Sequence, residues 1–275
     1  MGVCKYCHKD AGLFSSKHSA CEEKNRQGIN RIKAIIKNCF DLKEDFFLHK
    51  PQIDSIITES FIDYDTQILI YRDLLDEAVT KFLNDGIIDK KEETCIARFI
   101  QFTGIPQSTL NTTHALDKVV QSRIIQDILQ GNPIKQAITV AGDFPFMLAK
   151  NETLIWLYRN ITLHEQKIKR EYVGRSSGFN IRVAKGVYYR TGGFKGSPIE
   201  TSYMQKIGVG CVCLTDKNLY FSSMEKSLKI PYNKIISIES YSNGIGIQKD
   251  GANSKPVFLE GVSSWFAYNV IANYK

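Results

Sequence analysis

The spacing of apolar residues along the chain changes near residue 141. Before this point apolar side chains recur every three or four positions, which predicts amphipathic helices. The clearest helix is predicted over Tyr64 to Leu83, and Asn84-Asp85-Gly86 then ends it with residues typical of a helix C-terminus. Another is predicted over Asn111 to Gln130, before Gly131-Asn132-Pro133. The region up to residue 141 is therefore predicted to be a helical bundle.

After residue 141 the pattern is that of β-strands. β-branched and aromatic residues are dense over residues 153–174, and short alternating apolar and polar segments follow to about residue 260. A C-terminal amphipathic helix is predicted over Ser263 to Tyr274, with Trp265, Tyr268 and Ile271 or Ala272 on one side. The predicted fold class is thus α+β: helices first, then a mostly antiparallel β-barrel or sandwich capped by the final helix.

A dense group of metal-binding side chains lies within the first 21 residues, as Cys4-x2-Cys7-x10-His18-x2-Cys21. A Cys-x2-Cys pair supplies two thiolates from one tight turn. The spacing of His18 and Cys21 places both on one side of the first turn of a helix, for which Ser19 is the predicted N-cap. We therefore predict that these four residues bind one structural zinc ion.

Two other interpretations of this segment are weaker. His8 is an alternative ligand to His18, but it directly follows Cys7 and would strain the turn. A redox-active Cys-x2-Cys pair would require a strand before it and a helix directly after it, and neither is predicted. The tight turn, short hairpin and ligand-bearing helix start resemble a treble-clef zinc finger. Because four protein ligands leave no coordination position for water, the predicted zinc is structural and not catalytic.

The stretch NDGIIDKKEETCIARFIQFTGIP, residues 84–106, has a second distinctive pattern. Its acidic turn before an amphipathic helix resembles the repeated turn of TerB-like domains, which are helical bundles. An EF-hand would require Lys81 and Leu83 at its first two ligand positions, which excludes ordinary calcium binding. The turn is instead predicted to connect two helices, with Asp89 as the N-cap of the second helix and Glu92 completing a capping box.

The C-terminal region carries a further resemblance. The run Cys213 to Ser223, CLTDKNLYFSS, and the following KSLKIPYNKIISI, residues 226–238, resemble the core of bacterial PH-like and GRAM-like domains. The resemblance implies a strongly bent antiparallel barrel or sandwich that is plugged at one end by the C-terminal helix. Together with the N-terminal finger, the whole chain resembles a group of bacterial and phage proteins. This resemblance implies a fold but no particular chemistry.

Charge is distributed unevenly over the chain, whose net charge is +7. Residues 1–40 carry eight basic and three acidic side chains, residues 41–141 carry ten and sixteen, and residues 142–275 carry eighteen and ten. We assign these segments to a treble-clef-like finger with its helix, a TerB-like helical domain and a PH-like β domain. The basic ends indicate an anionic partner, an interaction with the acidic middle of the chain, or simply solvated faces of different charge.

Catalytic signatures are absent from the sequence. It has no G-x-S-x-G motif, no P-loop and no glycine-rich nucleotide fingerprint, and Gly244-x-Gly246 is interpreted as a bulge or turn. Cys211 and Cys213 point to the same side of a strand and could share a metal, but without a second pair they are interpreted as core or barrel-lining residues. We therefore predict a non-enzymatic protein with no small-molecule substrate. The lack of an apolar run of about 18 residues and of an apolar signal core predicts a cytoplasmic location.

Partner binding is predicted in the basic part of the β domain. Arg182, Lys185, Arg190 and Lys195 are the candidate surface, interleaved with aromatic residues. The leading prediction is an adaptor that recognises a protein or peptide. A nucleic-acid-binding protein that uses the basic finger and basic β face is the alternative, and docking to an anionic membrane surface is the third. Ordinary alternation in a strand, which places charges outward whether or not anything binds them, also accounts for this pattern.

Overall fold

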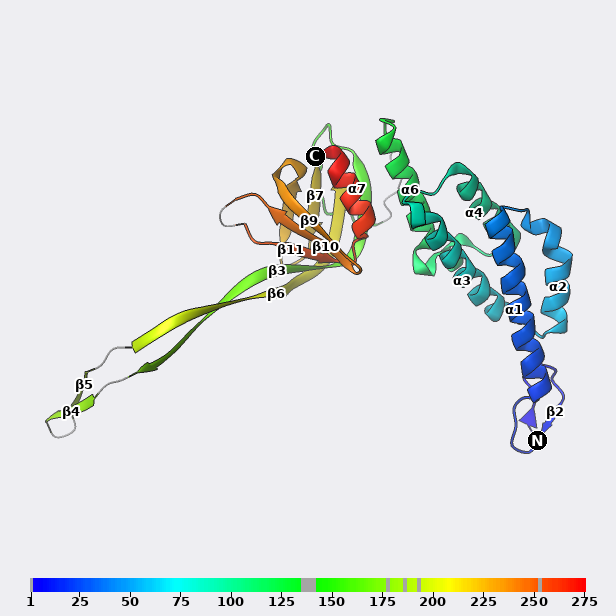
Figure 1. The fold of residues 1–275 in the computed structure, drawn as a ribbon, viewed down its shortest axis with the longest axis horizontal. Coiled ribbons are helices and arrows are strands. Elements are labelled where there is room, and N and C mark those ends of the chain that lie inside the picture. Colours follow the sequence, from blue (N-terminus) through cyan, green and yellow to red (C-terminus); the bar gives the residue numbers. More distant parts are fainter. Residues whose placement is uncertain (1, 135–141, 177–178, 185–186, 192–193, 252–253) are drawn as a thin grey trace. The chain divides into compact units, whose positions relative to one another are not determined.

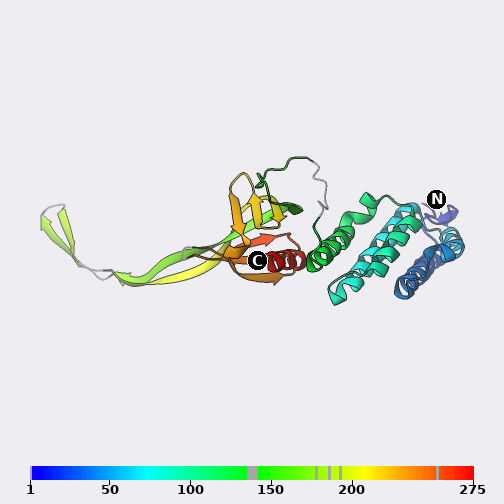
Figure 2. The ribbon, with the colours of Figure 1, turned by 90° about the horizontal axis from the view of Figure 1, so that it is seen from above.

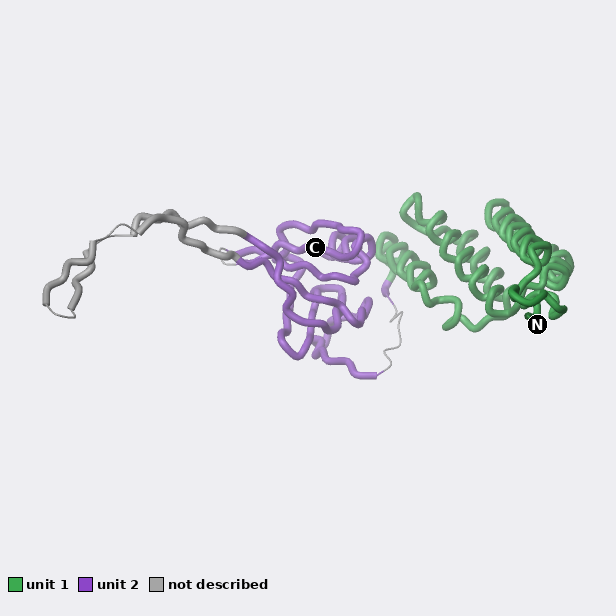
Figure 3. The backbone as a smooth tube through the Cα atoms, turned by 90° about the horizontal axis from the view of Figure 1, so that it is seen from below, with its two compact units in different colours: residues 1–132 green, residues 133–275 purple. Residues whose placement is uncertain are grey.

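The computed structural model describes residues 2–134, 142–176, 179–184, 187–191, 194–251 and 254–275, with the backbone alone over residues 168–201. It confirms the α+β class (Figure 1). Two compact units divide the chain, Met1–Asn132 and Pro133–Lys275 (Figure 3). None of the helices in these described ranges has both the length and the apolar character needed to cross a membrane.

The first unit contains a small hairpin and a set of helices. They are β1 (Gly2–Val3), β2 (Asp10–Gly12), α1 (Ser19–Leu42), η1 (Phe46–His49), α2 (Lys50–Glu59), α3 (Tyr64–Phe82), η2 (Leu83–Asp85), α4 (Lys90–Thr103), α5 (Gln107–Leu110), η3 (Asn111–Thr113) and α6 (Ala115–Leu129). This division into two units places no boundary at residue 40, so a separate zinc-finger domain stays a prediction. The physical reason is that α1 is one continuous helix, which begins beside the cysteines and packs along α2 and α3.

Aromatic side chains occupy the centre of the helical core. Phe99 of α4 is fully buried, and its ring centroid lies 4.8 Å from that of Phe40 and 5.1 Å from that of Phe46. Tyr71 of α3 contacts the same ring edge-on at 6.0 Å. These residues come from α1, η1, α3 and α4, so their burial holds the helices of this unit together.

The turn before α4 has the predicted capping box. The backbone N–H of Glu92 donates to the Asp89 carboxylate at 2.8 Å, and the Glu92 carboxylate accepts from the Asp89 N–H at 3.1 Å. Gly86 closes η2 with a φ of 97°, a conformation that favours glycine. The acidic residues of this turn therefore serve the helix N-terminus.

The second unit is built on an antiparallel sheet. Seven strands are arranged in the order β8-β7-β6-β3-β11-β10-β9, and β4 and β5 form a separate pair. Their bounds are β3 (Leu154–Ser176), β4 (Phe179–Ala184), β5 (Val187–Thr191), β6 (Phe194–Thr215), β7 (Asn218–Ser222), β8 (Ser227–Pro231), β9 (Ile235–Tyr241), β10 (Gly244–Lys249) and β11 (Val257–Glu260), with η4 at Tyr232–Lys234. The unit begins nine residues before the expected residue 142.

Strands β3 and β6 are much longer than the short strands predicted. Their pairing runs from Leu154 opposite Thr215 to Ser176 opposite Phe194. Neighbouring strands cover only part of this length, because β11 pairs with β3 over Thr162–Glu165 and β7 pairs with β6 over Cys211–Leu214. The backbone from Gln166 to Ser176 therefore continues with β6 as a two-stranded ribbon (Figure 1). The alternation of apolar and polar residues along one strand does not show where the neighbouring strands end, so the sequence did not predict this ribbon.

Helix α7 (Ser264–Tyr274) packs beside β9 and β10 (Figure 2). Ser263 is its N-cap, and the buried residues are Phe266, Ala267, Val270 and Ile271. The predicted buried side is therefore right only at Ile271, because Tyr268 is 47% exposed and Trp265 is only partly buried. The prediction followed the larger aromatic residues, whereas the helix buries the adjacent i, i+4 stripe, where Phe266 meets Trp156 at 5.6 Å.

A partly buried hydrogen-bond centre, which the sequence did not indicate, fixes the start of this unit. The Glu152 carboxylate accepts from the Thr215 hydroxyl at 2.6 Å, Asn218 at 2.7 Å, the Tyr220 hydroxyl at 2.8 Å and the Ala149 backbone N–H at 3.1 Å. Burial alone would raise the pKa of Glu152, but these hydrogen bonds outweigh it and lower the pKa to about 2. The segment before β3 is thereby tied to the β6–β7 turn.

Candidate metal centre

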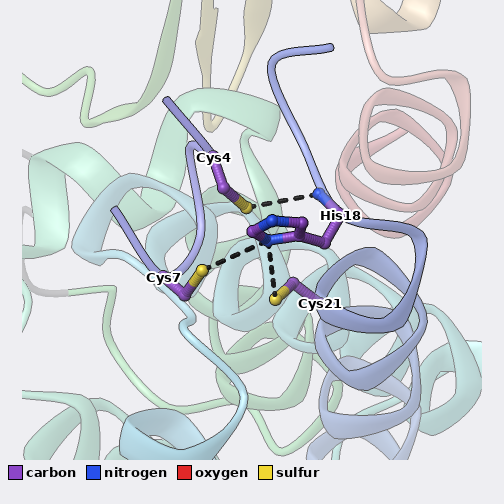
Figure 4. A group of neighbouring side chains, drawn as sticks. All are labelled: Cys4, Cys7, His18 and Cys21. Atoms are coloured by element: carbon purple, nitrogen blue, oxygen red, sulfur yellow. Dashed lines mark hydrogen bonds between the residues drawn. The ribbon is translucent and has the colours of Figure 1, made fainter. Parts of the chain in front are cut away.

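The four residues predicted as ligands come together at one end of the helical unit. The ligand atoms of Cys4, Cys7, His18 and Cys21 all lie within 4.8 Å of one another (Figure 4). The Nδ1 atom of His18 is 3.4 Å from the Cys7 sulfur and 3.8 Å from the Cys21 sulfur. Such a Cys3His cluster can hold a metal ion.

The first two cysteines are positioned by a tight turn between β1 and β2. The His8 N–H donates to the Cys4 carbonyl at 2.9 Å, and the Cys4 N–H donates to the Lys9 carbonyl at 2.8 Å. His8 itself adopts a left-handed conformation with a φ of 55° and is not among the four clustered residues. It therefore contributes to the turn that places both thiols on one side.

The other two ligands come from the start of α1. His18, not Ser19, is the N-cap residue, so the predicted cap is one residue too late. The reason is that His18 remains extended, with φ −89° and ψ 137°, while its side chain reaches back toward the turn. Lys17 and Glu22 form a salt bridge across this helix start. The helix begins directly at the cluster, so it carries Cys21 on the side facing His18.

The orientation of the His18 ring is set by a backbone group. Its Nε2 atom lies 2.9 Å from the carbonyl oxygen of Asp10, which can only accept a hydrogen bond. The proton is therefore assigned to Nε2, which leaves the Nδ1 lone pair directed at the sulfur atoms. Fixing the second ring nitrogen in this way is typical of metal-binding histidines.

Electrostatics favour a thiolate at Cys4. Burial would raise the pKa of this thiol, but hydrogen bonds from the backbone of Cys7, His18 and Tyr6 lower it to about 6. The backbone N–H of His18 donates to the Cys4 sulfur, with 3.3 Å between nitrogen and sulfur. At Cys21, burial and the neighbouring thiols of Cys7 and Cys4 raise the pKa to about 11. Adjacent thiolates repel one another, and a bound cation removes this repulsion.

The donor set fits zinc in number and spacing. Tetrahedral zinc with bonds of about 2.3 Å to sulfur and 2.0 Å to nitrogen separates the two donor atoms by about 3.5 Å. The observed nitrogen-to-sulfur distances of 3.4 Å and 3.8 Å bracket this value. Three thiols and one imidazole are also the soft and borderline ligands that structural zinc sites use.

A second group, which the sequence did not indicate, lies at the opposite end of α1. Cys39, Glu44 and His49 have ligand atoms within 4.8 Å of one another, and Nε2 of His49 is 3.5 Å from the Glu44 carboxylate. Burial raises the pKa of the Cys39 thiol, which disfavours the thiolate needed for metal binding. Cys213 is likewise fully buried, and burial raises its pKa to about 12, in agreement with its interpretation as a core residue.

The candidate partner surface is not gathered on one sheet. Arg182 lies in β4, Arg190 in β5 and Lys195 in β6, and their side chains are outside the described part of the structure. Lys185 lies outside the described residues altogether. Strands β4 and β5 pair with each other and belong to a different sheet from β6.

Comparisons with protein-family models, with curated proteins and with solved structures found no significant match to this chain.

Proposed function

We propose that this chain is a non-catalytic binding protein in which a structural zinc ion stabilises the N-terminal turn and helix. The zinc assignment rests on the clustering of four protein ligands. In this cluster Nε2 of His18 is hydrogen-bonded to the backbone carbonyl of Asp10, which leaves Nδ1 for the metal. Cys4, Cys7, His18 and Cys21 would hold the ion. Zinc would supply a covalent link between the β1–β2 hairpin and α1, and a full protein coordination shell disfavours a catalytic role.

Metal analysis tests this assignment directly. Purified protein is expected to contain about one zinc per chain, and Cys7→Ser is expected to lose most of it, because three ligands bind zinc much more weakly than four. Cys211→Ser is the matched control, since Cys211 lies in β6 and outside the cluster. Zinc-free wild-type protein, or equal zinc in both variants, would remove the assignment.

The proposed partner is a protein or peptide. Supporting this, the second unit presents an open sheet face with two carboxylates and two aromatic rings, Glu239, Tyr241, Phe258 and Glu260, beside a hollow of about 810 Å³. Partner capture from the native host, with and without nuclease treatment, tests the class. Protein retained after nuclease treatment supports protein recognition, because association mediated by nucleic acid is lost when the nucleic acid is degraded. Loss of all captured protein after nuclease treatment would favour nucleic-acid binding.

A second candidate function is nucleic-acid binding by the ribbon of β3 and β6. Residues 166–204 carry eight basic and two acidic side chains. A two-stranded ribbon is marginally stable alone in water, and β-ribbons of this kind can enter a groove of DNA. Binding to random duplexes across a salt series tests it: each neutralised phosphate contributes a log–log slope of about −0.9. No binding at roughly 50 mM salt would remove this candidate.

A further inference from the structure

The glycine pair Gly244-x-Gly246 is neither a bulge nor a turn, contrary to its interpretation from the sequence. Both residues lie in the regular pairing of β10 with β9 and β11, and the irregularity lies later, between Gln248 and Lys249. Gly244 stands between Tyr241 and Glu260, and Gly246 stands between Glu239 and Phe258. Each glycine is therefore the centre of a row of side chains across three strands.

The missing side chains make room for two aromatic rings. A Cβ atom at Gly246 would come within 3.1 Å of the Tyr241 ring. One at Gly244 would come within 2.3 Å of the backbone carbonyl oxygen of Leu259 and within 2.9 Å of the Phe258 ring. The two rings meet edge to face, with centroids 5.3 Å apart. Tyr241 and Phe258 thus lean over β10 from opposite sides and form an aromatic floor on this sheet face.

Carboxylates stand on both sides of this floor and are held in place. Glu239 accepts a hydrogen bond from the Tyr241 hydroxyl. Glu260 accepts from His164 at 3.0 Å and from Asn243 at 3.3 Å. The Glu260 side chain is still 44% exposed, so its oxygens remain accessible to a ligand. His164 also contacts the Phe258 ring, with centroids 5.7 Å apart.

The opposite face of β10 and β11 is occupied by the core, whereas β9 is exposed along most of its length. Ile245, Ile247, Val257 and Leu259 alternate with the residues of the aromatic floor and are almost fully buried, and α7 packs on β9 and β10. The hollow of about 810 Å³ therefore lies on the uncovered face of the sheet. We call it the β9–β11 groove, defined by Glu239, Tyr241, Phe258, Glu260 and His164.

The charge of the β9–β11 groove is opposite to that of its domain. Residues 142–275 carry eighteen basic and ten acidic side chains, yet among the described residues the groove lining includes two glutamates and no lysine or arginine. Lys206, which stands opposite His164 on β6, is not part of the lining, although, together with the hydrogen bond from His164, its charge helps to lower the pKa of Glu260. Aromatic faces flanked by carboxylates attract a cation through both cation–π and charge-assisted contacts.

We propose that the β9–β11 groove binds a basic, extended peptide segment of a protein partner, with a lysine or arginine side chain above Tyr241 and Phe258 and between Glu239 and Glu260. Strand β9 ends the sheet, so its outer edge offers main-chain groups to such a segment. This inference rests on the proposed function only in taking the partner to be a protein.

Peptide binding to the full chain tests the proposal. The probe is fluorescein-labelled acetyl-(Thr-Lys)4-amide. Two uncharged peptides are the controls: the same peptide with all four lysine side chains acetylated, and acetyl-(Thr-Gln)4-amide. The lysine peptide is expected to bind at least tenfold more tightly than either control, with a Kd on the order of 100 µM. Hydrogen exchange is expected to slow in residues 235–241 and 257–260. Equal affinity for all three peptides, or slowed exchange confined to the first unit, would overturn the proposal.

Variants separate the groove from general electrostatics. Glu239→Gln with Glu260→Gln is expected to weaken lysine-peptide binding at least tenfold, and Tyr241→Leu with Phe258→Leu to weaken it at least threefold. Glu59→Gln with Glu225→Gln makes the same change in net charge outside the groove and is expected to leave binding unchanged. Unchanged binding in the first variant, or equal weakening in the control, contradicts the groove. If the groove proposal fails in this way, the zinc content and the nuclease-resistant partner capture would still be as expected. Failure of the groove can therefore be distinguished from failure of the proposed function.

Discussion

The metal cluster of the first unit and the β9–β11 groove of the second unit are assembled in opposite ways. The cluster draws its four side chains from 18 consecutive residues, Cys4 to Cys21. The groove draws its side chains from β3, β9 and β11, and His164 lies 96 residues from its partner Glu260. Local spacing therefore determines the first site, whereas strand register determines the second.

Different interactions hold the two sites together as well. The β1–β2 hairpin is short, and both of its strands are at least partly exposed, so it has little apolar surface to bury. The groove lies partly on β10 and β11, whose other face is buried in the core of the second unit, while β9 at its edge is mostly exposed. The short hairpin of the metal cluster can thus depend on a bound ion for a fixed conformation, whereas strand pairing in the sheet positions the residues of the groove.

Metal removal is expected to have the largest effect and to separate the two regions most clearly. Chelation, or Cys7→Ser, should unfold residues 2–21, because zinc binding in small fingers contributes on the order of 10 kcal/mol to their folding. Hydrogen exchange should accelerate in that segment and in the first turns of α1, and remain unchanged in β10 and β11. Full protection of residues 2–21 without metal would show that the hairpin is held by packing alone.

Truncation of the α7 anchor should reduce the stability of the second unit next most strongly. Phe266→Ala removes a fully buried ring and should cost about 3–5 kcal/mol. Trp265→Ala is the comparison, and its cost should be smaller because Trp265 is only partly buried. Native-state hydrogen exchange of β9 to β11 measures both. A larger loss for Trp265→Ala would restore the helix face predicted from the sequence.

The Glu152 centre should contribute a smaller, pH-dependent stabilisation. Glu152→Gln weakens four hydrogen bonds to a carboxylate and should cost about 2 kcal/mol. Because the folded pKa of about 2 lies below the ordinary value of 4.5, its stabilisation is complete above about pH 4.5 and is lost as the pH falls toward 2. Unfolding of the second unit should therefore show less acid sensitivity in Glu152→Gln than in the wild type. Identical pH profiles would contradict this role.

The smallest expected effect concerns a local interaction in the first unit. Asp89→Ala removes the N-cap of α4 and should cost about 1 kcal/mol, whereas Asp89→Asn should restore most of the stability, since asparagine caps nearly as well. Thermal unfolding of the helical unit measures the difference. Equal stability of the two variants would mean that the capping box does not stabilise α4.

The sequence alone was sufficient wherever chemistry depends on short spacing. The order of helices and strands, the capping box of Asp89 and Glu92, and the grouping of Cys4, Cys7, His18 and Cys21 all follow from residues within one turn or one short segment. The backbone geometry of a turn or a helix start fixes the relative positions of such residues before any tertiary packing. Zinc as the bound ion remains a prediction.

Only the tertiary structure decided which side chains meet across elements. It placed Phe266 instead of Trp265 in the core, gathered four donors around Glu152, and set Gly244 and Gly246 between the rings of Tyr241 and Phe258. The physical reason is that pairing register and helix rotation depend on the summed burial of many residues. A one-residue shift in β10 would exchange its buried and exposed faces, and no short motif specifies that choice.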